Sequence, residues 1–183
     1  MPAKQALPLL NDGAAGPIVA SHCFMKTDPT VTALSSRSVE VRLSPVHGRG
    51  VYALRRLPRG TCIGLYEGRR YTAPALLEVD WHARHEGMTY LFGLSDGMTI
   101  DGAEGGNATR FINHSCEPNC LAQEVTDEHG MPVLQVVTSK RILPGAELFL
   151  DYALTIDESE TPADYPCRCG ARTCRGTLVA RTP

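Results

Sequence analysis

Residues 110–120, Arg110-Phe111-Ile112-Asn113-His114-Ser115-Cys116-Glu117-Pro118-Asn119-Cys120, carry the densest group of polar side chains in this chain of 183 residues. The stretch places two Asn, one His, one Ser and two Cys around a single Pro. Burying such groups is unfavourable unless each one is hydrogen bonded. A capped turn explains part of this pattern but not all of it, so the stretch is a candidate functional segment.

The seven cysteines indicate a metal before they indicate disulfides, because an odd number suits a full set of disulfides poorly. Cys167, Cys169 and Cys174 follow a C-x-C-x4-C spacing, which supplies three of the four thiolates of a tetrahedral zinc site. Cys116 or Cys120 is available as the fourth ligand. The alternative is a set of three surface thiols that bind nothing.

Two shorter segments are weaker signals when each is taken alone. In His47-Gly48-Arg49-Gly50, the two glycines let the backbone approach a ligand closely, although a plain turn between strands has the same composition. In Glu147-Leu148-Phe149-Leu150-Asp151-Tyr152, a tyrosine ends a predicted strand, where packing is its most frequent role.

The pattern elsewhere predicts a mostly β domain with small α pieces. The one predicted helix runs from Ala73 to about His85 and has Pro74 near its start. A single helical turn is expected over 108–113, and Asp127–Gly130 is expected to join two strands as a hairpin. The predicted strands cover residues 39–43, 51–54, 62–66, 90–94, 98–101, 121–126, 133–139 and 148–152.

Composition narrows the class of protein. The chain is long enough for one domain, has no apolar run of membrane-spanning length, and starts with a poor secretory signal. Its net charge of −2 argues against a nucleic-acid backbone as the main partner. Residues 67–104 hold seven acids and three Arg, which favours either a solvated face or attraction of a basic peptide. Residues 1–37 are expected to form a flexible lead-in.

Taken together, these segments resemble the SET-domain protein lysine methyltransferases. The matching motifs are GRG before VYA, then RFINHSCEPNC, ELFLDY and the post-SET tail CRCGARTCRGTL, in the order found in that family. The trithorax or mixed-lineage-leukaemia type is the nearest. The resemblance covers about residues 38–180. It implies a mostly β SET fold of the β-clip type, with several short curved sheets, one modest helix and a pseudoknot near the active site. It places the SET domain at 38–154 and a zinc-bound post-SET segment at 163–180.

The resemblance also implies roles for individual residues. An S-adenosylmethionine site and a lysine channel are expected on opposite faces, meeting at a narrow pore. Tyr152 and Tyr90 are the implied catalytic residues. The implied cofactor-binding residues are His47, Gly48, Arg49, Gly50, Tyr90, Arg110, Asn113, His114 and Tyr152. Tyr90, Phe92 and Leu150 would line the channel. Cys116, Cys167, Cys169 and Cys174 would hold one structural zinc ion, leaving Cys120 out.

The implied activity is transfer of a methyl group from S-adenosylmethionine to a lysine of a basic protein tail, with histone H3 or a histone-like protein as the expected substrate. No membrane or direct nucleic-acid partner is expected. A soluble, intracellular protein is implied: nuclear if eukaryotic or a host-directed effector, cytoplasmic if bacterial and acting locally. The alternatives are an inactive peptide-binding module and a zinc-organised structural domain. The family usually has Phe or Tyr two residues before the catalytic tyrosine, whereas this chain has Leu150, which predicts more than monomethylation.

Overall fold

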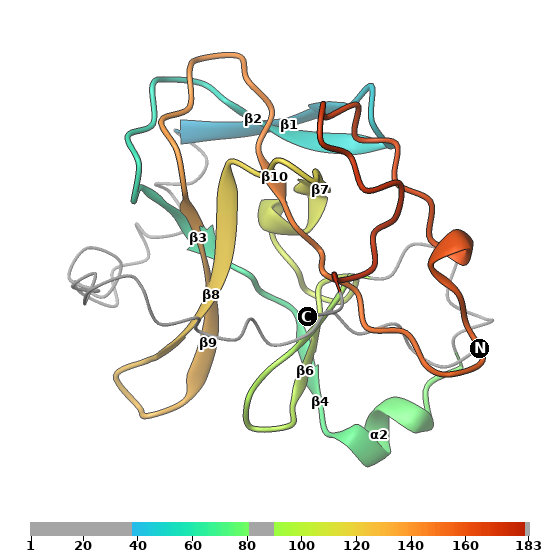
Figure 1. The fold of residues 1–183 in the computed structure, drawn as a ribbon. Coiled ribbons are helices and arrows are strands. Elements are labelled where there is room, and N and C mark those ends of the chain that lie inside the picture. The colour runs from blue at the N-terminus through green and yellow to red at the C-terminus, as the bar shows by residue number, and fades with distance from the viewer. Residues whose placement is uncertain (1–37, 81–89, 182–183) are drawn as a thin grey trace.

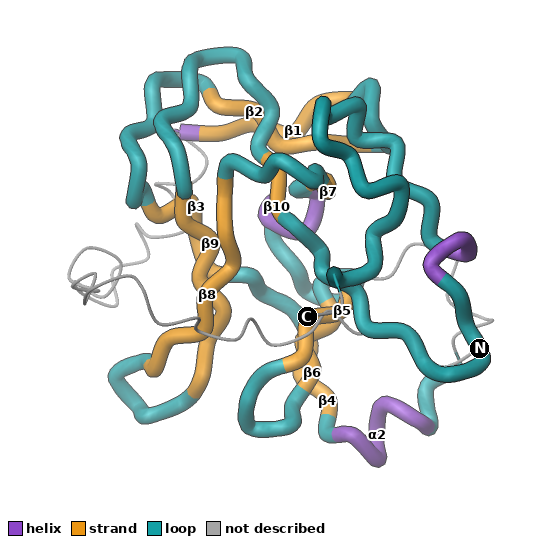
Figure 2. Tube along the Cα trace, in the orientation of Figure 1, coloured by secondary structure: helices purple, strands orange, loops and turns teal. Residues whose placement is uncertain are grey.

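The computed structural model describes residues 38–80 and 90–181. Within these ranges the chain forms ten short strands in four small sheets, together with one α-helix and two 3₁₀ turns (Figures 1 and 2). The predicted mostly β fold with one short helix is therefore confirmed. The predicted lead-in over residues 1–37 lies outside the described residues.

The four sheets are small and mostly antiparallel. The first pairs β1 (Val39–Leu43) with β2 (Arg49–Ala53), and the second has the order β3 (Cys62–Leu65), β9 (Pro132–Thr138), β8 (Cys120–Thr126). The third has the order β4 (Arg69–Tyr71), β6 (Thr99–Asp101), β5 (Leu91–Gly93). The fourth pairs β7 (Asn113–His114) with β10 (Phe149–Leu150) and is parallel. The first sheet lies at one end of the molecule and the third lies with α2 (Ala73–Leu77) at the opposite end (Figure 1).

The hairpin of β8 and β9 forms because its turn carries the appropriate side chain. The Asp127 carboxylate accepts hydrogen bonds from the backbone N–H groups of His129 and Met131 at 2.9 and 2.8 Å. Such a side-chain cap stabilises a tight turn locally. The seven residue pairs from Cys120–Thr138 to Thr126–Pro132 follow in regular antiparallel register. The hairpin predicted at Asp127–Gly130 is confirmed.

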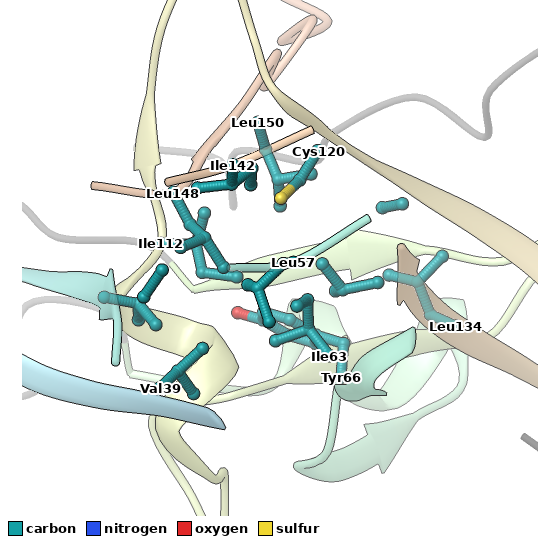
Figure 3. Packing of buried hydrophobic residues seen from close by; sticks show 14 of the residues in the cluster. Val39, Leu57, Ile63, Tyr66, Ile112, Cys120, Leu134, Ile142, Leu148 and Leu150 are labelled. Carbon is teal, nitrogen blue, oxygen red and sulfur yellow. The ribbon is translucent and has the colours of Figure 1, made fainter. Parts of the chain in front are cut away.

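A single apolar core joins the sheets. Val51, Leu57, Val136 and Leu148 are fully buried, and Leu57 forms a two-way backbone bridge with Ile142. Figure 3 shows that side chains far apart in sequence, from Val39 to Leu150, pack together there. Ile112 and Leu150 also belong to this core, so the segments that contain them are anchored by apolar packing.

The single α-helix is shorter than predicted. The helix α2 ends at Leu77, since Glu78 already donates its N–H to the carbonyl of Ala75 rather than continuing the α-helical pattern. The Leu76 side chain is buried but Leu77 is 84% exposed, so no apolar stripe supports a longer helix. The part of the predicted helix after residue 80 lies outside the described residues.

Three further details differ from the sequence-based expectations. The strands β4 and β7 were not expected, and β10 covers only Phe149–Leu150 rather than residues 148–152. The acids of 67–104 do not form one solvated face, because Asp101 is buried and Glu104 pairs with Arg69 at 3.0 Å.

The C-terminal segment folds back along the chain that follows β10. Leu154 pairs in parallel with Val179, and Pro166, just after the 3₁₀ turn η2 (Pro162–Asp164), pairs with Thr177. Tyr165, which follows this turn, is buried. The segment therefore packs against the chain that follows β10. Among the described residues, no helix is long and apolar enough to cross a membrane.

Candidate active site

The polar segment of residues 110–120 is joined to the strand β10 by backbone and side-chain hydrogen bonds. The parallel pairing of β7 with β10 continues in a bond from the Ser115 N–H to the Leu150 carbonyl at 2.9 Å. The Asn119 carboxamide imitates a strand partner, since it donates to the carbonyl of Glu147 and accepts from the N–H of Phe149, each at 2.8 Å. Two motifs that are far apart in sequence thus form one rigid unit.

The Asn113 side chain is the centre of a buried hydrogen-bond cluster. Its Nδ2 donates to the carbonyls of His47 at 3.2 Å and Arg49 at 3.0 Å, and to Oε1 of Glu147 at 2.9 Å. All three partners are acceptors, so the orientation of the carboxamide follows from the network. Among the described residues, none donates a hydrogen bond to its Oδ1, which is left as an acceptor.

The local structure explains why both positions of the GRG segment hold glycine. Gly48 adopts a φ of +47° at the turn between β1 and β2, a conformation that favours glycine. A Cβ placed on Gly50 would lie 2.1 Å from Oε1 of Glu147. The expected close approach of this backbone is therefore made by a buried carboxylate of the same chain.

The side chains of His47 and Arg49 lie outside this cluster. Both residues are exposed, and only their carbonyls contact Asn113. The Arg49 guanidinium stacks 3.9 Å above the ring of Phe111, an arrangement that orders an otherwise flexible cation.

The buried His114 connects the tyrosine that ends the ELFLDY motif to the cysteine cluster. Its Nδ1 accepts from the Tyr152 N–H at 3.1 Å, and its Nε2 lies 3.4 Å from Sγ of Cys116. Burial lowers the pKa of His114 to about 4, although Asp151 nearby opposes the shift. The imidazole is therefore neutral near pH 7, with its proton on Nε2.

The Tyr152 hydroxyl is a neutral phenol. It donates to the carbonyl of Ile112 at 2.9 Å, and burial raises its pKa well above the ordinary value of 10.0. Such a hydroxyl is unsuited to act as a phenolate base near neutral pH but is well suited to orient a neighbouring group through its oxygen lone pairs.

A narrow pocket of about 30 Å³ opens beside Tyr152. A volume of this size holds one or two water-sized groups. Five residues of the predicted site line it, namely Tyr90, Phe92, Arg110, Leu150 and Tyr152. Five more residues line it that were not predicted, namely Tyr66, Leu91, Thr109, Ile112 and Leu154. The lining is mostly aromatic and aliphatic.

The predicted site thus divides into two groups. His47, Gly48, Arg49, Gly50, Asn113 and His114 do not line the pocket. Asn113 binds Glu147 and the carbonyls of His47 and Arg49, and His114 accepts from the N–H of Tyr152. Tyr152 is shared, because it lines the pocket and its N–H is bound to His114.

The four cysteines at positions 116, 167, 169 and 174 lie together, with their sulfurs all within 4.8 Å of one another. Cys116 Sγ lies 3.8 Å from that of Cys167 and 3.9 Å from that of Cys174. Tetrahedral zinc with Zn–S bonds of about 2.3 Å separates its sulfurs by about 3.8 Å. The donor set and its spacing therefore fit one structural zinc ion.

Backbone N–H groups donate hydrogen bonds to the sulfurs of this cluster, as is favourable for metal-bound thiolates. Each of the four sulfurs accepts a backbone N–H at 3.4–3.5 Å. Arg175 donates to Cys116, Cys169 to Cys167, Cys116 to Cys169, and Gly176 to Cys174. Such bonds stabilise negative charge on sulfur. Cys120 is separate: it is buried in the apolar core, and burial raises its pKa to about 12.

An ion pair next to the cysteine cluster reaches the residue before Tyr152. The Arg175 guanidinium binds both carboxylate oxygens of Asp151, at 2.7 and 2.5 Å. Asp151 in turn accepts from the N–H of Ala153, whose φ of +43° is unusual for a residue other than glycine. The C-terminal segment thus stabilises the backbone turn that carries Tyr152.

We expect the substitution Arg175→Ala to lower the free energy of unfolding by about 1–3 kcal/mol, because it leaves the half-buried Asp151 carboxylate without its bidentate partner. Urea denaturation measures this change. The exposed Arg172 lies in the same segment, so Arg172→Ala is the matched control and should change little. Equal losses in the two variants would contradict a stabilising role for the pair.

Besides the pocket-lining residues, four residues of the hydrogen-bond and ion-pair network of the candidate site escaped prediction from the sequence. Glu147 and Asp151 belong to the ELFLDY motif, and Asn119 and Arg175 belong to the two cysteine-containing motifs, so their neighbourhood was a signal. The partners of these residues were not evident, because each partner lies at least 24 residues away in sequence. Tyr66 gave no such signal, yet its hydroxyl donates to the carbonyl of Tyr90 at 2.8 Å.

Comparisons with known proteins agree with this geometry. The family model described as "SET domain" matches residues 48–153. The human protein "Histone-lysine N-methyltransferase 2B" is 35% identical over 79% of this chain, and "Histone-lysine N-methyltransferase trithorax" of Drosophila virilis is 36% identical over 76%. The match covers 5% and 4% of those proteins, so the chain corresponds to only a small part of their length.

A solved structure gives the same result. The crystal structure titled KRYPTONITE in complex with mCHH DNA, H3(1-15) peptide and SAH is similar with a TM-score of 0.62 and 30% sequence identity. This similarity covers 76% of the present chain and 29% of that one. The matched family model includes the GRG, RFINHSCEPNC and ELFLDY motifs and spans more than half of the chain, which therefore belongs to the SET domain family.

Proposed function

We propose that this protein is an S-adenosylmethionine-dependent protein-lysine N-methyltransferase. The observation that carries the proposal is the position of Tyr152, which joins a narrow aromatic pocket on one side to the Asn113–His114 strand on the other. A lysine methyltransferase needs such a junction, because the amine and the methyl donor must meet in line at one point.

The cofactor side of the site is assigned to the cluster around Asn113. Its Oδ1 and the polar backbone of residues 47–50 offer acceptors suited to the ammonium group of an amino-acid ligand. His47, Gly48, Arg49 and Gly50, with Arg110, Asn113 and His114, would hold the cofactor, and Tyr90 and Tyr152 would contact it. S-adenosylmethionine supplies an electrophilic methyl group when bound. The SAH in the similar KRYPTONITE structure supports this assignment.

The lysine side is assigned to the pocket lined by Tyr90, Phe92, Leu150 and Tyr152. A lysine in water has a pKa of about 10.4 and is protonated, so it cannot attack until it loses a proton. Removal of water by the aromatic lining lowers that pKa, and a nearby positive charge lowers it further. The Tyr152 oxygen would orient the amine, while the aromatic faces would stabilise methylated, cationic products.

The zinc ion would have a structural role and would be held by Cys116, Cys167, Cys169 and Cys174. On this view, residues 38–154 form the SET domain and residues 163–180 form the post-SET segment. The chemistry belongs to the first, whereas the second stabilises the turn at Tyr152 through Arg175.

Histone H3 is the proposed substrate, which would place the activity on nuclear chromatin if the protein is eukaryotic. Two similar proteins support H3: a methyltransferase of Schizosaccharomyces pombe described as H3 lysine-4 specific, and the KRYPTONITE complex with an H3 peptide. The name of the human histone-lysine N-methyltransferase 2B supports a histone substrate. The test is transfer of label from radioactive S-adenosylmethionine to intact histones and to H3 peptides with single Lys→Arg changes. Label on H3 that one such change removes would identify the site. Binding of the cofactor without label on any histone would contradict the proposed substrate.

Leu150 predicts the number of methyl groups transferred. It lines the pocket and has no hydroxyl to hold a water molecule against the amine, so we expect di- and trimethylated products. The substitution Leu150→Tyr should shift the products toward monomethyl-lysine, with Leu150→Phe as the control that adds a ring without a hydroxyl. Mass spectrometry after exhaustive turnover measures the distribution. Monomethyl product alone from the unaltered protein would refute this prediction.

A further inference from the structure

A buried glutamate lies at the centre of the cofactor side of the site and has no assigned role. Glu147 is 9% exposed and accepts three hydrogen bonds from neutral side chains. Asn113 Nδ2 donates to its Oε1 at 2.9 Å, while the Ser44 and Tyr52 hydroxyls donate to its Oε2 at 3.1 and 2.9 Å. No Lys, Arg or His among the described residues forms an ion pair with it.

A carboxylate without a cationic partner is an expensive group to bury, so stability alone does not account for it. The donor set explains the residue type. The Asn113 amide and the Ser44 and Tyr52 hydroxyls all donate toward the same side chain. A carboxylate suits these three donors because both of its oxygens act as acceptors. Charge also makes each bond stronger than a bond between neutral groups.

The chain makes room for this carboxylate. Gly50 has no side chain, and a Cβ there would lie 2.1 Å from Oε1 and 2.8 Å from Cδ of Glu147. The backbone of Glu147 is fixed as well, since it bridges to Tyr52 and its carbonyl accepts from Asn119. The carboxylate is therefore held in one position against the turn at residues 47–50.

We propose that Glu147 is a positioning residue, whose carboxylate orients the Asn113 side chain and thereby the cofactor-binding turn. By holding one Nδ2 hydrogen, it leaves the other for the carbonyls of His47 and Arg49, and it directs Oδ1 away from the protein partners. The inference rests on the proposed function, because it treats Asn113 as a cofactor ligand. It adds a residue that acts through Asn113 without contacting the reacting atoms.

The experiment compares Glu147→Ala, Glu147→Gln and the control Glu124→Ala, which removes an exposed glutamate bonded to Ser95 in the β8 region. Titration calorimetry measures the Kd for S-adenosylmethionine and for SAH, and kinetics separate KM from kcat. We expect Glu147→Ala to raise both Kd values and the KM for S-adenosylmethionine at least tenfold, with a smaller change in kcat. Gln retains an oxygen for Asn113, so Glu147→Gln should stay within about threefold of the unaltered protein. The control Glu124→Ala should have the Kd, KM and kcat values of the unaltered protein.

Two further measurements separate positioning from a general loss of structure. In the double variant Asn113→Ala with Glu147→Ala, affinity should be no weaker than in Asn113→Ala alone, because the glutamate acts through the asparagine. In the free protein, Glu147→Ala should displace the Asn113 side-chain amide signals in ¹⁵N-HSQC spectra while the zinc content stays the same.

Each contrary result overturns the inference. A Glu147→Ala protein that melts at a lower temperature but binds the cofactor normally when folded has lost only stability. Additive losses in the double variant, or a Glu147→Gln protein as impaired as Glu147→Ala, would exclude action by hydrogen bonding through Asn113. If the unaltered protein binds neither ligand, the proposed function fails and the role of Glu147 fails with it. If the unaltered protein binds both ligands and the Glu147 variants bind them equally well, the role of Glu147 is refuted and the proposed function stands.

Discussion

The substitution Tyr152→Phe is expected to lower the rate of methyl transfer by about 10²–10³-fold while leaving the affinity for S-adenosylmethionine within a few-fold. This is the range observed when one preorganised hydrogen-bonding group is removed from an active site. Phe fills the same volume, so the packing of the pocket is kept. The backbone N–H of residue 152 still binds His114, so the cofactor side is not disturbed.

Single-turnover kinetics and calorimetry on the same preparation measure these two quantities. Tyr71→Phe is the matched control, because Tyr71 lies on β4, does not line the pocket, and has its hydroxyl 3.4 Å from Glu104. The control should turn over at the unaltered rate. A parallel loss of rate and affinity in Tyr152→Phe would instead assign Tyr152 to binding alone.

The substitution Cys169→Ser is expected to abolish stoichiometric zinc binding and to release the C-terminal segment. Structural zinc in small peptides contributes an apparent binding free energy of about 10–16 kcal/mol, which is comparable to the whole stability of a domain. Serine is a poor zinc ligand, and the loss of one thiolate also removes the acceptor for the Cys116 N–H. Activity should fall as well, since Arg175 no longer reaches Asp151.

Plasma mass spectrometry of the metal and hydrogen exchange over residues 154–180 measure these effects. Cys120→Ala is the control, because Cys120 lies in the core and apart from the cluster. It should bind one zinc ion per chain and keep the segment protected. One zinc ion per chain in Cys169→Ser would remove Cys169 from the metal site.

Elements that depend on neighbours in sequence were predictable, whereas those that depend on distant partners were not. The β8–β9 hairpin followed from its turn and alternation, and the turn over 108–113 appears as the 3₁₀ turn η1 (Ala108–Phe111). The strand β7 is only two residues long and exists because β10, about 35 residues away, pairs with it. No local pattern specifies such a strand.

The site shows the same division. The cysteine spacing indicated a metal but left Cys116 and Cys120 as alternatives, between which the family resemblance chose Cys116. The structure agrees, since it places Cys116 beside the C-terminal segment and Cys120 in the core. The helix was predicted too long because apolar residues in sequence do not reveal that Leu77 points to solvent. The burial of Glu147 had no sequence signal at all, since glutamate is usually exposed.

The ion pair between Asp151 and Arg175 has a consequence for biosynthesis. Closing contacts across long loops costs entropy that only the finished contacts repay. During translation, the turn at Tyr152 emerges from the ribosome before the arginine that holds it. The apolar core can therefore form early, whereas the turn at Tyr152 gains its partner only when residues 167–175 have been made. A nascent chain that stalls before those residues would be partly folded, with the Asp151 carboxylate still lacking Arg175.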